Sequence, residues 1–196
     1  MGLLLAMGLL GLVFGGIGYY LYSVVVGAKQ SWNQKVAEPA RASGVRVLPG
    51  AHGFAQLCVD RPDGPATAFV NNLVASEPSV APLLRHFNTN GWLTIVTKPY
   101  VAGVGPGFLV QKGVAPGSLP LGDPAFDSTH HVRAVAAPER IPQVWSPHAR
   151  ELMQRSGSRF QVVSGGRAIT IVARGVVEDA RLVLDMMGLA HELARA

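Results

Sequence analysis

The sequence has a single cysteine, Cys58, and few charged residues. A lone thiol cannot form an intrachain disulfide, which excludes the class of small domains held together by disulfides and agrees with a reducing compartment. Charged residues make up only 15% of the 196 residues, and basic residues never gather in a run with aromatic residues between them. We therefore expect no nucleic-acid surface, and the net charge of +5 better suits anionic lipid headgroups.

The sequence motifs of common enzymes are also absent. No Gly-x-Ser-x-Gly nucleophile elbow occurs. The glycine-rich stretch 103–107 leads into a strand-like segment at 108–111 and has no following Lys-Ser or Lys-Thr pair, so it is not expected to bind phosphate. Cys58 could act as a nucleophile beside His52 or Asp60, but its apolar, strand-like surroundings favour a buried core thiol. We predict no cofactor.

The first 28 residues contain no ionisable side chain other than tyrosine. A helix needs about 20 apolar residues to cross the hydrocarbon core of a bilayer, and this run is longer. Its tyrosines lie toward the C-terminal end, where aromatic rings with a polar tip prefer the headgroup boundary. We therefore predict a transmembrane helix over residues 3–26, within a membrane anchor at 1–28, with the lipid bilayer as its partner.

A cleavable signal peptide is the alternative interpretation of this run. Val26 and Ala28 fit the small-residue pattern that precedes a cleavage point, but no Lys or Arg comes before the run, and the run is long for a signal peptide. By the positive-inside rule, the basic residues that follow place the C-terminal domain in the cytoplasm, at a bacterial inner membrane. These residues are Lys29, Lys35, Arg41 and Arg46.

Glycines recur inside the predicted anchor at intervals of three and four residues. At about 100° per residue they fall on one helix face, where a second helix can approach closely. One interpretation is a homo-oligomer that forms through this face, and the other is the high glycine content typical of membrane helices. The residues are Gly8, Gly11, Gly15 and Gly18.

Residues 29–44 are more polar and include a proline at position 39 and a glycine at position 44. They are compatible with a juxtamembrane helix and with a partly ordered linker, and the sequence does not separate the two. We expect the soluble domain to occupy residues 45–196.

Short segments of the soluble domain have the alternation and β-branched content typical of strands. Gly165-Gly166 joins two of them and suits a tight hairpin turn. The prediction is a fold of the α+β class, in which helices cover a mainly antiparallel sheet. The predicted strands lie at 45–48, 53–59, 66–70, 92–97, 108–111, 131–136, 159–164 and 167–173.

Three helices are predicted among these strands, at 79–87, 146–155 and 177–194. Ser146 and Pro147 are suited to the cap and first position of the second helix. The third has a wide apolar face and must cover a sheet or a partner. The order of elements suggests two β-α-β-β halves, 45–118 and 119–196, although residue identity between them is too low to establish a duplication.

Residues 121–133, with the helix, hairpin and helix predicted after them, resemble a group of uncharacterised bacterial membrane proteins. Those proteins share a Gly-Asp-x-x-Phe-Asp motif, and this chain departs from their pattern at His130-His131, where an aromatic residue is usual. The resemblance implies an α+β domain of unknown function tethered to a membrane, and it implies no activity. The matching residues are Gly122, Asp123, Phe126 and Asp127.

The same segment holds the densest group of potential metal ligands in the chain. Carboxylates and imidazoles suit a divalent transition metal, but adjacent strand residues point to opposite faces, so the two histidines cannot easily serve one ion. The structural interpretation is that Phe126 anchors the loop in the core while Asp127 caps backbone N–H groups. The candidate ligands are Asp123, Asp127, His130 and His131.

Two functional hypotheses follow from the sequence. The first is a non-enzymatic, single-pass, membrane-anchored module that assembles with or recruits an unknown protein partner. The alternative is a metal-assisted hydrolase centred on residues 123–131.

Overall fold

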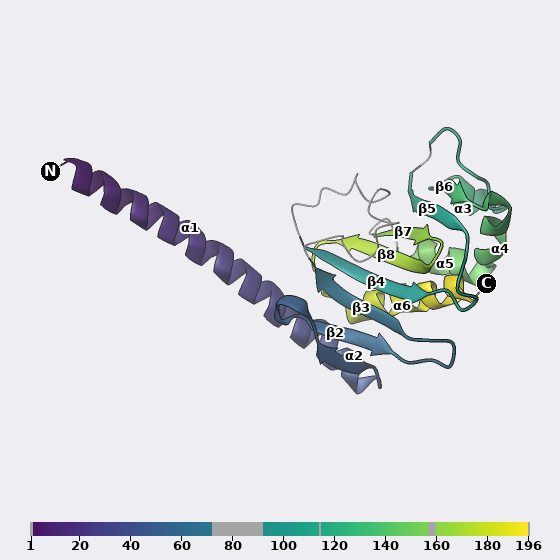
Figure 1. Ribbon diagram of the computed structural model, residues 1–196, viewed down its shortest axis with the longest axis horizontal. Helices are drawn as coiled ribbons and strands as arrows, with labels where there is room; N and C mark the ends of the chain where they lie inside the picture. The colour runs from purple at the N-terminus through teal and green to yellow at the C-terminus, as the bar shows by residue number, and fades with distance from the viewer. Residues whose placement is uncertain (1, 72–91, 114, 157–159, 196) are drawn as a thin grey trace.

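The computed structural model describes residues 2–71, 92–113, 115–156 and 160–195, with side chains from Val13 onward. These residues form a long N-terminal helix and one domain built from a sheet and helices (Figure 1). The strands are β1 Arg46–Pro49, β2 Ala55–Val59, β3 Ala66–Asn71, β4 Leu93–Pro99, β5 Gly107–Lys112, β6 His130–Ala136, β7 Phe160–Gly165 and β8 Ala168–Arg174.

The helical elements are α-helices of different lengths, one π-helix and two 3-10 turns. The α-helices are α1 Gly2–Trp32, α2 Glu38–Ala42, α3 Pro124–Asp127, α4 Ile141–Val144, α5 Pro147–Arg155 and α6 Ala180–Ala194. A π-helix, η1, spans Asn33–Ala37, and 3-10 turns span Ala51–Gly53 (η2) and Pro138–Arg140 (η3). The predicted helix at 79–87 lies outside the described residues.

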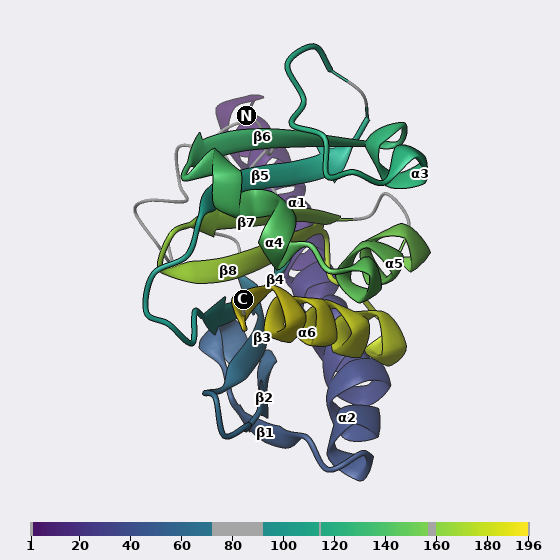
Figure 2. The ribbon, with the colours of Figure 1, turned by 90° about the vertical axis from the view of Figure 1, so that its right-hand side faces the viewer.

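The eight strands form one sheet in the order β1-β2-β3-β4-β8-β7-β5-β6, and every named pairing is antiparallel. Figure 2 shows this order from bottom to top, with α4, α5 and α6 on the near side. The α+β prediction is confirmed. The strands of the two proposed halves interleave, because the β7–β8 hairpin lies between β4 and β5, and the internal repeat stays a prediction.

The predicted hairpin and helix signals have clear structural counterparts. Strands β7 and β8 pair directly, and Gly166 in their turn has a φ of 94°, which favours glycine. Ser146 caps α5 by accepting a hydrogen bond from the Ala149 N–H, 3.1 Å away, and Pro147 is the first helical residue. Both predictions are confirmed.

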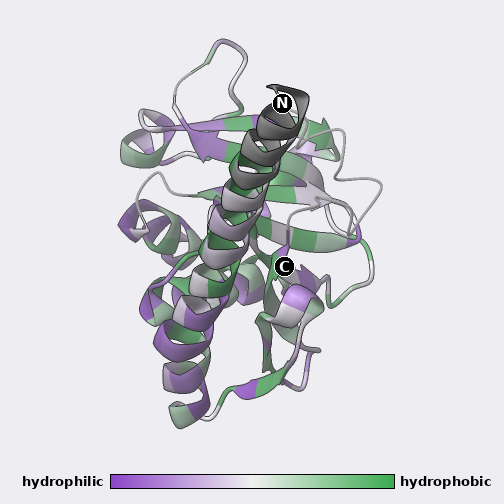
Figure 3. Ribbon diagram, turned by 90° about the vertical axis from the view of Figure 1, so that its left-hand side faces the viewer, coloured by the Kyte–Doolittle hydropathy of each residue, from purple (hydrophilic) through white to green (hydrophobic). Residues whose placement is uncertain are grey.

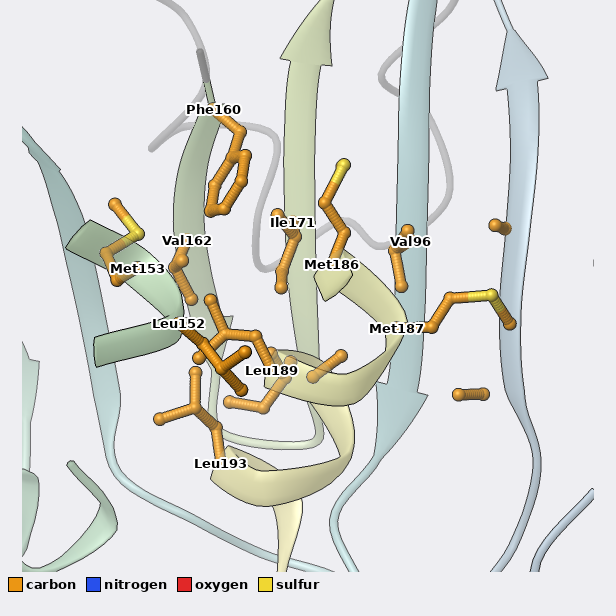
Figure 4. Packing of buried hydrophobic residues seen from close by; sticks show 14 of the residues in the cluster. Val96, Leu152, Met153, Phe160, Val162, Ile171, Met186, Met187, Leu189 and Leu193 are labelled. Carbon is orange, nitrogen blue, oxygen red and sulfur yellow. The ribbon is translucent and has the colours of Figure 1, made fainter. Parts of the chain in front are cut away.

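Helix α6 covers the face of the sheet that carries the main core. It begins at Ala180 rather than at 177, because the Asp179 carboxylate accepts hydrogen bonds from the N–H groups of Arg181 and Leu182. Its apolar face packs on strands β3, β4 and β8 and against α5, and Figure 4 shows the buried side chains of this region together with those of β7. The labelled residues are Val96, Leu152, Met153, Phe160, Val162, Ile171, Met186, Met187, Leu189 and Leu193.

The N-terminal helix does not stop at the expected boundary near residue 28. It continues through Trp32 and passes through η1 into α2, so most of segment 29–44 is helical. The helical residues Trp32, Val36 and Ala40 are fully buried and belong to the main core. The indole Nε1 of Trp32 donates a hydrogen bond to the Ala55 carbonyl in β2, at 2.9 Å. This segment is therefore part of the packed domain.

Among the residues with described positions, no helix is long and apolar enough to cross a membrane. The predicted transmembrane helix over 3–26 is therefore not confirmed.

Candidate functional site

The Gly-Asp-x-x-Phe-Asp loop is held together by its two carboxylates. Asp123 caps the short helix α3 by accepting hydrogen bonds from the N–H groups of Ala125 (3.0 Å) and Phe126 (3.2 Å). Asp127 accepts three more, from Leu121 at 2.9 Å, Gly122 at 3.2 Å and Asp123 at 3.3 Å. Both oxygens of Asp127 are thus engaged by backbone donors, which is the capping contact expected from the sequence.

Phe126 connects this loop to the core. Its ring is fully buried and stacks on His130, with centroids 4.3 Å apart and an interplanar angle of 13°. On its other side it meets Trp145 at 5.4 Å, and Trp145 in turn contacts Phe108 of β5 at 6.0 Å. A single aromatic side chain therefore ties an otherwise small and polar loop to α4 and the sheet.

The four candidate metal ligands do not converge. The Asp123 carboxylate lies 3.4 Å from Arg150 Nε, and His130 is buried with Nδ1 2.9 Å from the Thr129 hydroxyl. His131 follows on the opposite face of β6, in register with Gln111. Over the described ranges, no group of three or more His, Cys, Asp or Glu side chains is placed to hold a metal ion. The hydrolase hypothesis therefore gains no supporting geometry.

Cys58 is buried near the edge of the sheet, beside Arg46 and Asp60. The Arg46 guanidinium donates to Cys58 Sγ at 3.3 Å and to the Asp60 carboxylate at 2.7 Å, while Sγ lies 3.5 Å from the same carboxylate. His52 lies elsewhere, with its ring against Trp92. The structure brings Cys58 to Asp60 but not to His52, so no imidazole lies beside the thiol among the residues that the structure describes.

The side-chain hydroxyls of Tyr100 and Ser164 lie next to each other in the core, but they do not form a reactive pair. The Tyr100 hydroxyl lies 3.0 Å from Ser164 Oγ, which donates to the Pro106 carbonyl at 2.5 Å. Burial raises the pKa of Tyr100 to about 12, although the Ser164 hydrogen bond works against the rise. Because both groups are buried and mutually satisfied, they fix the loop that leads into β5.

A charged cluster that the sequence analysis missed surrounds the Asp63-Gly64 turn. Lys98 is fully buried, and its Nζ donates to the carbonyls of Asp63 (3.1 Å) and Gly64 (2.9 Å) and lies 3.5 Å from the Asp63 carboxylate. From α6, His191 Nδ1 approaches that carboxylate to 3.5 Å and Arg195 Nε to 3.9 Å. The ammonium of Lys98 is committed to these contacts, which makes it a fastener between β4 and the turn rather than a base.

One signal for this cluster was present in the sequence. Thr94, Val96 and Lys98 alternate along β4, which places a lysine at an inward-facing position. A buried lysine requires partners, but these come from residues 63 and 64 and cannot be identified from local pattern alone.

Two buried histidines predict a dependence of stability on pH. Burial lowers the pKa of His130, and it lowers that of His191 together with the positive charges of Arg61, Lys98 and Arg195. The folded state therefore binds fewer protons than the unfolded state as pH falls below the ordinary histidine value of about 6.5. We expect full stability above this pH and a falling melting temperature below it.

The measurement is a series of melting curves of the full chain in detergent between pH values above and below the histidine range. His191→Gln should flatten the dependence, whereas the same change at the exposed His148 should leave it as in the parent. An identical dependence in the parent and in His191→Gln would contradict the assignment.

A surface hollow of about 700 Å³ opens between the end of β8 and the start of α6. Its lining combines valines with Arg174, Glu178 and Asp179. Glu178 is bound by Lys35 at 2.6 Å, and Asp179 is the cap of α6. Both carboxylates already have structural roles, so the hollow offers no acid–base pair.

The remaining unusual surface is α1 itself. From Val13 to Val24 its large side chains are 49–75% exposed, and no charged residue occurs before Lys29. Figure 3 looks along this helix and shows its hydrophilic residues gathered at the end that joins the domain. Gly15 and Gly18 of the glycine face have no atom within 4 Å of an added Cβ, while Gly8 and Gly11 precede the described side chains.

No family model, no curated protein and no solved structure matches this chain. The resemblance to uncharacterised membrane proteins with a Gly-Asp-x-x-Phe-Asp motif therefore stays a prediction.

Proposed function

We propose that the protein is a non-enzymatic module that its N-terminal helix holds at a bacterial inner membrane, where the sheet domain assembles with or recruits a partner on the cytoplasmic side. The observation that carries the proposal is the contrast along α1. Its side chains are exposed from Val13 to Val24 and uncharged as far as Ala28, whereas four residues after Ala28 Trp32 is fully buried in the domain.

An exposed helix of this composition needs an apolar environment. Five aliphatic or phenyl side chains between Val13 and Val24 are each about half exposed or more, and such contiguous surface marks contact with a membrane or a protein. The run continues toward the N-terminus through the leucines of residues 3–12. Insertion across a bilayer depends on those residues as well as on the described part of α1.

The assembly role is supported by how the other polar groups are used. The two loop aspartates and Lys98 have their atoms occupied by structural hydrogen bonds, and among the described residues no imidazole lies beside Cys58. Because α1 continues directly into the core, the orientation of the domain relative to the helix is fixed. A second copy can pack on the open face at Gly15 and Gly18, and weaker cross-linking of Gly15→Ile than of the parent would indicate that contact.

The experiment is extraction of the full chain from bacterial membranes with alkaline carbonate. The parent should stay in the pellet, and Ile17→Arg should shift a large fraction to the supernatant, since a charge within a membrane helix costs about 2.5–3.5 kcal/mol. Val135→Arg is the matched control, because Val135 is 53% exposed and Ile17 is 51% exposed. Equal extraction of all three proteins would contradict the proposal.

Orientation is tested separately with a reporter fused after residue 196. Fluorescent protein should emit and alkaline phosphatase should be silent, because the basic residues after the helix favour the cytoplasmic side. Active phosphatase would reverse the orientation while leaving membrane attachment intact.

A further inference from the structure

The end of the sheet beside α1 carries a contiguous set of basic and aromatic side chains. Lys29 of α1 lies over Gly53, where an added Cβ would come within 3.0 Å of its Nζ. Next to Gly53, the His52 ring meets the edge of Trp92 at 5.7 Å, and Trp92 also packs against Phe54 at 5.0 Å. We call Lys29, His52, Gly53 and Trp92 the root surface, because they surround the root of α1.

The root surface is fixed rigidly to the helix. Asn33, in η1, accepts a hydrogen bond from the Ala55 N–H at 3.0 Å and donates to the Gly53 carbonyl at 3.4 Å. Trp92 is held from the other side, since its carbonyl accepts from the Gly175 N–H at 2.8 Å. Figure 1 shows α1 meeting the domain beside the start of β2, where these contacts lie. The position of the root surface along the axis of α1 is therefore fixed. If α1 enters a membrane, the root surface lies at a defined distance from it.

The root surface lies close to the point on α1 where the apolar side chains end. Val24 is the last large side chain with about half of its surface exposed, and Lys29 follows five residues later, about 7.5 Å farther along the helix. The indole of Trp92 is partly exposed at this level, whereas Trp32 and Trp145 are 0% and 1% exposed. Tryptophan and lysine are the side chains that favour the boundary between hydrocarbon and headgroups.

The charges of the described residues around the root of α1 also suit anionic lipid. Lys29 is basic, and its ammonium lies beside Gly53 on the root surface. The carboxylate of Glu178, at the root of the same helix, is neutralised by Lys35 at 2.6 Å. Basic groups beside a membrane helix attract phosphate-bearing anionic headgroups.

We propose that the root surface rests on the headgroup layer of the membrane, with Trp92 at the boundary and Lys29 against anionic phosphates. This inference rests on the proposed membrane attachment of α1 and adds the orientation and the lipid class. The domain then lies directly on the bilayer, with the end of β6 and the loop at 101–106 turned away from it.

Trp92 itself is the probe. The full chain is reconstituted into phosphatidylcholine–phosphatidylglycerol vesicles that contain lipid brominated near the headgroup end of its acyl chains. Bromine should quench a clearly larger fraction of the emission in the parent than in Trp92→Phe, because the other two described tryptophans are buried in protein. Phenylalanine keeps the ring contacts with His52 and Phe54.

Flotation of the same samples separates the two proposals. Co-flotation with equal quenching of the parent and Trp92→Phe would overturn the root-surface inference and leave membrane attachment standing. Failure of the parent to float with vesicles would overturn both. Co-flotation with quenching that depends on Trp92 supports both.

A charge variant tests the lipid class. In the parent, adding phosphatidylglycerol to phosphatidylcholine vesicles should increase the quenching of Trp92. Lys29→Gln should remove most of that increase, whereas Arg167→Gln should retain it, because Arg167 is an exposed basic residue in the β7–β8 turn at the opposite end of the sheet. An equal increase in all three proteins would overturn the role of Lys29.

Discussion

Replacing Phe126 with alanine is expected to lower the free energy of unfolding by about 3–5 kcal/mol. The side chain is fully buried between His130 and Trp145, so its removal leaves a cavity beneath the loop and ends two ring contacts. A loss of this size is a large share of the stability of one domain. Denaturant unfolding of the full chain in detergent measures it.

Two comparisons make this prediction specific. Phe14→Ala removes the same ring from a site where it is 66% exposed, and it should change the unfolding free energy by less than about 0.5 kcal/mol. Asp127→Ala should cost about 1–2 kcal/mol, because it removes the acceptor of three loop N–H groups without opening a large cavity. Unchanged stability in Phe126→Ala would show that the loop is not fastened through its ring.

Replacing Trp32 with alanine is expected to have a similarly large effect, about 3–5 kcal/mol. The indole is fully buried and also donates the 2.9 Å hydrogen bond to Ala55, so the substitution removes both packing and the contact that joins the helix to β2. The effect should appear in the same unfolding experiment.

The control for Trp32 lies twelve residues earlier on the same helix. Tyr20 is 66% exposed and does not belong to the described core cluster, so Tyr20→Ala should leave domain stability within about 0.5 kcal/mol of the parent. Equal losses in both variants would mean that the stability of α1 itself, and not its joint with the domain, is being measured.

Local signals in the sequence predicted local structure well. The hairpin at Gly165-Gly166 and the start of α5 at Ser146-Pro147 were identified because turn and cap preferences act over a few residues. The burial of Phe126 followed from one large apolar side chain in a polar loop. These features depend on neighbours in the chain, which the sequence shows directly.

Features that depend on distant partners were not predicted. The position of β8 beside β4 joins residues about 70 to 80 positions apart, and the Lys98–Asp63–His191 cluster draws on three separate elements. Trp32 lies in segment 29–44, for which the sequence did not separate a juxtamembrane helix from a partly ordered linker. Its burial depends on contact with β2, and the spacing of apolar residues along the helix does not show that β2 packs there.

The strand order also constrains how the protein can fold while it is being synthesised. Strands β4 and β5 are consecutive among the described strands, yet they do not pair, because the β7–β8 hairpin fills the space between them. Until Arg174 has left the ribosome, both strands have an unpaired edge that can capture another chain. A nascent chain stalled after β6 is therefore a natural client for chaperones, and a truncation that removes the hairpin leaves the sheet in two separate pieces.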